Sequence, residues 1–133
     1  MTAFHRALTQ FWARFTVDDV AVPAYLSGHV PDGAVFPYIT FDVARPDTMN
    51  KTVLTAFDWH QAASGVNVNA ERAALLDQIA AAIPQEGVKL PFGDGFAILE
   101  RNTADFQTYY DDPDPESGIV GGRTSYIARF FGL

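Results

Sequence analysis

The sequence predicts an α+β fold, an antiparallel sheet of about four to five strands with two helices packed on one side. Two segments repeat apolar residues every three or four positions, which is typical of amphipathic helices. Several others alternate apolar and polar residues and are rich in β-forming types. Their order along the 133 residues is α-β-β-α-β-β-β, without an internal repeat or a linker. We therefore expect one domain spanning residues 1–133.

Two segments carry the helical pattern. The first is MTAFHRALTQFWARF, with an apolar stripe made by Phe4, Leu8, Phe11, Trp12 and Phe15. The second lies within ASGVNVNAERAALLDQIAAAIPQEG, where Asn67 or Asn69 is the expected cap and Pro84 the expected stop. Its stripe consists of Leu75, Leu76, Ile79 and Ile83, and its many alanines allow close packing against a sheet.

The strand predictions begin with a hairpin. Residues 36–43 and 51–61 pair around a turn-rich tip, and Pro37 suits the start of a strand or a sheet edge. In the second strand Val53, Thr55, Phe57 and Trp59 share one face, while Leu54, Ala56, Asp58 and His60 share the other. Residues 17–33 are interpreted as a connection with short extended pieces. Further strands are predicted at 95–102, 105–110 and 123–131, the last of them central, with a bulge or kink at Gly121 and Gly122.

Composition restricts the function. Nine basic against sixteen acidic residues give a net charge of −7, and the chain has two lysines and no basic run, which argues against specific nucleic-acid binding. Eleven Phe, five Tyr and two Trp are many rings for one small core, so some are expected at an interface. There is no cysteine, no signal-peptide pattern and no apolar run of membrane-spanning length, so we expect an intracellular protein with no membrane association.

The stretch YYDDPDPESGIVGG (109–122) gathers Asp111, Asp112, Asp114 and Glu116. As a calcium loop it fails, because Ser117 stands where the turn needs glycine and Arg123 where the bidentate glutamate should be. As a catalytic pair it lacks the burial that would hold one carboxyl neutral. A dozen residues without secondary-structure signal are instead typical of a loop that contacts a partner.

Other catalytic and metal-binding patterns are weak. His5, His29 and His60 have no zinc-ligand spacing. Asp58 and His60 share a strand face and could mimic a triad with a serine, but no G-x-S-x-G elbow occurs. The glycines in 91–97 and 118–124 match no phosphate-binding motif. We therefore expect no enzyme activity and no catalytic residue, metal or cofactor.

The pattern as a whole resembles the tailed-bacteriophage tail terminators and related neck (head–tail joining) proteins. The similarity covers most of the chain and consists of the N-terminal helix, VFPYITFDV, AFDWHQAASG, NAERAALLDQIAAAI and the ending GGRTSYIARFFG. The acidic DDPDPES stretch matches no shared motif.

The resemblance implies a structural virion protein of the neck or tail, assembled in the host cytoplasm. Six copies would form a ring that caps the tail tube, ends its polymerisation and joins the tail to the head connector. The implied partners are other copies, the tube protein and the connector proteins, while DNA passes through an acidic lumen without binding. The candidate contact residues lie in two loops and are Arg45, Asp47, Asp111, Asp112, Asp114 and Glu116. The alternatives are a head-completion or stopper protein, and a small acidic enzyme or ligand-binding domain.

Overall fold

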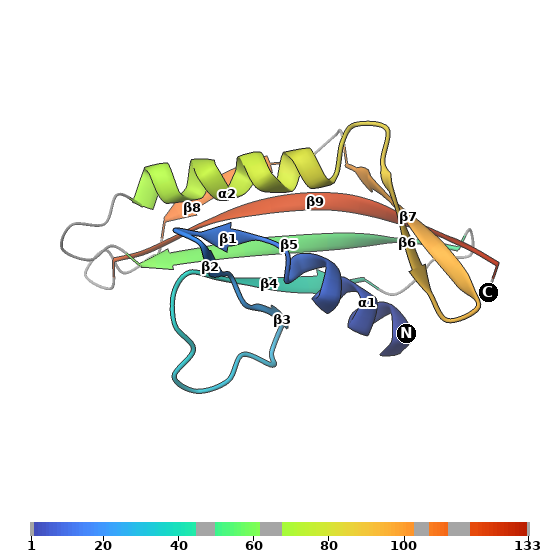
Figure 1. Ribbon diagram of the computed structural model, residues 1–133, viewed down its shortest axis with the longest axis horizontal. Coiled ribbons are helices and arrows are strands. Elements are labelled where there is room, and N and C mark those ends of the chain that lie inside the picture. Colours follow the sequence, from blue (N-terminus) through green and yellow to red (C-terminus); the bar gives the residue numbers. More distant parts are fainter. Residues whose placement is uncertain (1, 45–49, 62–67, 103–106, 112–117, 133) are drawn as a thin grey trace.

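The computed structural model describes residues 2–44, 50–61, 68–102, 107–111 and 118–132, with 107–111 described by backbone alone (Figure 1). These residues form two helices and nine strands, in the order α1 (Thr2–Trp12), β1 (Thr16–Val17), β2 (Val20–Ala21), β3 (Ala24–Leu26), β4 (Tyr38–Val43), β5 (Lys51–Gln61), α2 (Val68–Ala82), β6 (Val88–Phe92), β7 (Gly95–Arg101), β8 (Gln107–Asp111) and β9 (Ile119–Phe131).

One main sheet organises the molecule. Its strands lie in the order β3-β4-β5-β9-β7-β6, and β8 pairs with the first part of β9, beyond the reach of β7. All its pairings are antiparallel except that of β3 with β4. β1 and β2 form a separate two-stranded hairpin. The predicted α+β class with a mostly antiparallel sheet is thus confirmed, and the sheet has more strands than expected.

The pairing register divides the sheet into two faces. Successive side chains in a strand point to opposite faces, so aligned residues of neighbouring strands share a face. Leu54 of β5 aligns with Tyr126 of β9, and Tyr126 aligns with Arg101 of β7, so these side chains point the same way. Leu54 and Tyr126 are fully buried, which identifies this side as the core face.

Helix α1 covers the core face through its aromatic stripe, as the spacing predicted. Phe4 contacts Phe130 edge-to-face at 5.0 Å between ring centroids, and Trp12 contacts Tyr126 at 5.7 Å. All five predicted stripe residues are buried. Some aromatic rings were expected at an interface, and Phe11 and Trp12 are not among them, because both lie in the core.

Helix α2 runs along β5 and β9 on the same face, held by apolar and polar contacts (Figure 1). Leu75, Ile79 and Ile83 are buried beneath it. At its start, Arg72 donates a hydrogen bond to the Gly121 carbonyl of β9. At its end, Arg101 of β7 donates to two carbonyl oxygens that the helix leaves without an intrahelical partner, those of Ala80 (2.8 Å) and Ile83 (2.9 Å).

The segment predicted as a connection with short extended pieces coincides with the short strands β1, β2 and β3. Three details of the sequence prediction were wrong, the first being that Val88–Phe92 forms the unpredicted β6. β9 begins at Ile119, inside the stretch expected to lack secondary structure. Gly121 and Gly122 make no bulge, because they pair in unbroken register with Trp59 and Asp58.

Candidate interaction surface

The second face of the sheet is the main candidate site, and we call it the open face. It consists of Lys51, Val53, Thr55, Phe57 and Trp59 of β5 together with the residues aligned with them on the neighbouring strands. Both helices pack on the other face, and two large apolar side chains of the open face, Val53 and Phe131, are 39% and 44% exposed.

Aromatic rings continue across the open face in three contacting groups. Phe57 and Trp59 stack at 6.2 Å, and the Trp59 indole N–H donates to the Thr40 hydroxyl at 3.0 Å. Phe96 and Phe131 stack at 5.2 Å at one end of the sheet. The third group consists of Tyr25, Phe36 and Tyr38, in which Tyr38 contacts the other two rings. Half-exposed aromatic surface of this kind is enriched at protein interfaces.

The open face also differs from the rest of the surface in charge. Its cations are Lys51, Lys89, Arg123 and Arg129, and its carboxylates are Asp42 and Glu100. Elsewhere among the described exposed residues, carboxylates outnumber cations. The cations are Arg6 and Arg14, and the carboxylates are Asp18, Asp19, Asp32, Asp77, Glu86 and Asp94. In a chain of net charge −7 the open face is therefore the comparatively basic side.

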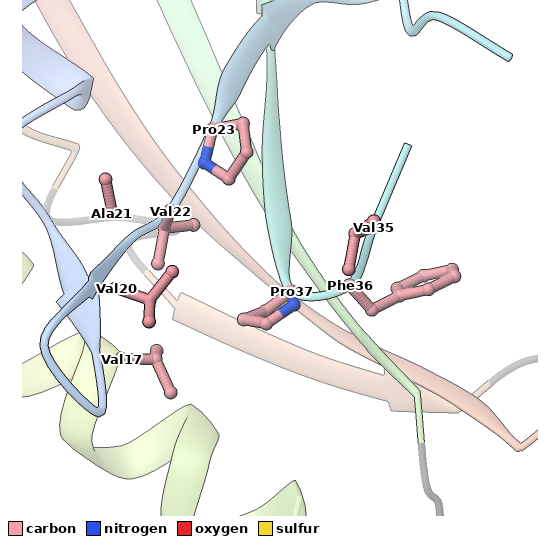
Figure 2. A pocket seen from close by; sticks show the side chains of 8 residues that line it. All are labelled: Val17, Val20, Ala21, Val22, Pro23, Val35, Phe36 and Pro37. Atoms are coloured by element: carbon pink, nitrogen blue, oxygen red, sulfur yellow. The ribbon is translucent and has the colours of Figure 1, made fainter. Parts of the chain in front are cut away.

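A small apolar groove lies beside the sheet, at the start of β4 (Figure 2). It has a volume of about 170 Å³ and is lined by Val17, Val20, Ala21, Val22, Pro23, Val35, Phe36 and Pro37. Val20 and Val35 are 68% and 75% exposed. Ligand pockets for drug-sized molecules are larger, about 300–1,000 Å³, and place polar groups around the ligand. This groove is suited to receiving one apolar side chain.

A buried histidine bridges two carboxylates where α2 meets β5. His60 is fully buried, and its Nε2 lies 2.7 Å from an Asp58 carboxylate oxygen. Its Nδ1 lies 2.5 Å from a carboxylate oxygen of Glu71, in the first turn of α2. Both ring nitrogens donate only in the protonated imidazole, so the geometry favours the imidazolium form.

The pKa of His60 follows from opposing effects. Burial lowers this pKa, but the hydrogen bonds to Asp58 and Glu71 and the charges of both carboxylates raise it, and the net result lies above the ordinary value of 6.5. A general base needs one ring nitrogen directed at a substrate, whereas here both are engaged by carboxylates. The cluster therefore joins α2 to β5, and it adds Glu71 to the Asp58–His60 pair that the strand alternation placed on one face.

Most of the predicted contact residues lie outside the described residues, namely Arg45, Asp47, Asp112, Asp114 and Glu116. Asp111 ends β8, and only its backbone is described. The structure thus leaves the two predicted contact loops as a prediction. Trp59, undecided between core and interface from sequence, is half-buried on the open face. Phe96 and Phe131 were not singled out from the sequence, although their alternation with buried neighbours could have identified them.

Three further findings concern metal ligands, membrane-spanning helices and related proteins. Within the described ranges, no group of three His, Asp or Glu side chains is arranged to hold a metal ion. No helix in the described part of the chain has the length and apolarity needed to cross a membrane. No protein-family model and no curated protein matches the chain at the significance required.

Proposed function

We propose that this chain is a structural subunit of a tailed-bacteriophage virion, a tail terminator. Its copies form a hexameric ring that caps the tail tube, ends tube polymerisation and joins the tail to the head connector. The chain makes and breaks no covalent bond in this role. Its mechanism is complementarity between surfaces, repeated by symmetry.

The open face is the observation that carries this proposal. A sheet with helices on one face leaves its other face to be covered by a partner or by water, and on this sheet that face carries aromatic pairs and exposed Val53 and Phe131. Partly exposed aromatic side chains of this kind are enriched at protein interfaces. The order of helices and long strands also agrees with the sequence resemblance to tail terminators.

Several neck proteins share this size and topology, so a head-completion or stopper protein is the second candidate. The same open face favours it, since both kinds of protein act by stacking rings. The two candidates differ in the partner that they cap, which is the tail tube for a terminator and the portal-side connector for a stopper.

The test is polymerisation of the tail-tube protein of the same phage in the presence of this chain. We expect tubes of shortened length, each with an added ring at one end when viewed by electron microscopy, and we expect the chain to co-sediment with them. Val53→Glu is the matched negative control. It places a charge in the centre of the open face and should therefore abolish capping.

Tubes that grow to the same length with and without the chain, and chain that stays in the supernatant, would refute the terminator role. Binding to connector rings with no effect on tube growth would instead support the stopper candidate.

A further inference from the structure

The outward face of α2 is unusual for a helix in contact with water. Its exposed positions include Ala73, Ala74, Asp77 and Ala81, which fall on one side of the helix at spacings of three or four residues. Surface helices normally present charged and polar residues outward, and a helix that is apolar on every side is normally buried. The outward side of this helix consists mainly of alanines, with Asn69 and Asp77 as its exposed polar positions, and it is therefore poorer in polar groups than is usual for a surface helix.

The open face is a sheet surface that such a helix side could cover. It is a wide sheet surface with exposed Val53 and half-exposed Phe57 and Trp59, and both helices of its own chain lie on the opposite side. Helices cover both faces of the sheet in α/β folds, whereas in α+β folds they lie on one face of an antiparallel sheet and leave the other face to a partner or to water. Within the described residues, each copy thus has one sheet face without a helix and one helix face without a sheet.

The charges on the open face and on the outward side of α2 also favour contact between these two surfaces. On the open face Arg123 is aligned with Phe57 and Lys51 with Arg129, and the four cations of this face outnumber its two carboxylates, Asp42 and Glu100. The outward side of α2 carries Asp77, and Glu86 is exposed just beyond the end of the helix. Opposite charge on the two surfaces favours their encounter, and like charge disfavours the competing pairing of one open face with another.

We propose that the occupant of the open face is a second copy of this chain, which docks the alanine-rich side of its α2, centred on Ala74, against Val53 and its neighbours. The contact gives the open face the helical layer that its own chain does not supply. It is heterologous, since the two surfaces lie on opposite sides of one sheet, and repeating it produces a closed ring if the rotation closes. This inference rests on the proposed self-assembling role and specifies the subunit contact that the role requires.

Chemical cross-linking tests the contact directly because the chain has no cysteine. Ala74→Cys and Val53→Cys are single, conservative changes at exposed positions, and within one chain they lie on opposite sides of the sheet. A mixture of the two variants, treated with a short bismaleimide, should give a covalent dimer. Each variant treated alone should give at least ten-fold less. Matched controls replace one partner by Ala3→Cys on α1 or by Val20→Cys on β2.

A second pair of variants tests the same contact without a cross-linker. Ala74→Glu removes the helix surface and Val53→Glu the sheet surface, so each variant alone should be monomeric by analytical ultracentrifugation. Their mixture should form a heterodimer of one copy each, because one intact helix face and one intact open face remain, and it should not grow further.

Three results would overturn the inference. The first is a mixture of the two variants that does not cross-link above the controls. The second is cross-linking of Val53→Cys with itself, which indicates pairing of two open faces. The third is protection of Val53→Cys from maleimide by oligothymidylate, a single-stranded DNA, rather than by a second copy, which indicates that nucleic acid occupies the open face. Failure of the proposed function is separable. A ring that forms through Ala74 and Val53 without stopping tube growth would leave this contact standing and refute the terminator role.

Discussion

Replacing Glu71 by Gln should make the protein less stable below neutral pH and should reduce the pH dependence of its stability. In the native chain the Glu71 carboxylate lies 2.5 Å from Nδ1 of buried His60. Glutamine keeps an oxygen that accepts this hydrogen bond but removes the negative charge that raises the pKa of His60. The change therefore isolates the electrostatic part of the contact between α2 and β5.

The magnitude follows from the strength of charge-assisted hydrogen bonds. A bond to a charged group contributes about 1.5–3 kcal/mol to stability and a neutral one about 1 kcal/mol. Glu71→Gln should therefore lower the free energy of unfolding by about 0.5–2 kcal/mol where His60 is protonated. For comparison, His60→Leu would leave the charges of Asp58 and Glu71 facing each other without a cation, at a cost of about 3–5 kcal/mol.

The sign of the pH dependence is fixed by the direction of the pKa shift. Because the pKa of His60 is higher in the folded chain than its ordinary value of 6.5, the folded state holds the proton more tightly. The resulting stability is fully present below pH 6.5 and is lost as the pH rises through the folded pKa, with a slope of at most about 1.4 kcal/mol per pH unit. The pKa of His5 is lowered, chiefly by burial, and works in the opposite direction equally in every variant.

The assay is urea unfolding at a concentration where the chain is monomeric, followed by tryptophan fluorescence between pH 5.5 and 9. Native protein and Glu71→Gln should differ most below pH 6.5 and converge at high pH. Glu86→Gln, at an exposed position, is the matched control and should follow the native curve. A constant difference between native protein and Glu71→Gln over the whole pH range would refute the reasoning.

Three further predictions concern other parts of the molecule. Gly95→Ala should destabilise the fold by at least about 2 kcal/mol in urea unfolding, because a Cβ atom there would overlap the Phe131 carbonyl oxygen, whereas Asp94→Ala next to it should be nearly neutral. Arg101→Met should cost about 2–3 kcal/mol by the same measurement and increase amide hydrogen exchange at the end of α2, since two carbonyl oxygens lose their charged donor. Lysines introduced within residues 111–116 should slow DNA ejection from the virion and leave assembly intact if that stretch lines the lumen, whereas they should impair assembly if it forms the predicted partner contact, and unchanged ejection kinetics in assembled virions would count against the lumen role.

Local pattern predicted the elements that depend on near neighbours in the chain. The stripe from Phe4 to Phe15 indicated α1, the run of leucine, isoleucine and alanine indicated α2, and strict alternation indicated β5 and assigned its residues to the correct faces. These elements could be recognised because periodic burial leaves its period in the sequence.

Elements that depend on distant partners were predicted only as short extended pieces, and their pairing was not. β3 has three residues and exists through its parallel pairing with β4, while β1 and β2 meet in a turn where Asp18 and Asp19 both have positive φ, a conformation more often signalled by Asn-Gly. Short strands carry too few residues to show a period, and tertiary contacts decide whether they pair.

By itself, the sequence determined that this is an acidic, aromatic-rich, cysteine-free α+β chain, because composition and periodicity are properties of residues taken singly or a few positions apart. Only the tertiary structure decided that Glu71 completes the buried site of His60, and that one aromatic face of the sheet stays without a helix of its own. The physical reason is that sheet register brings together side chains far apart in the chain, and no local pattern records which of them will meet.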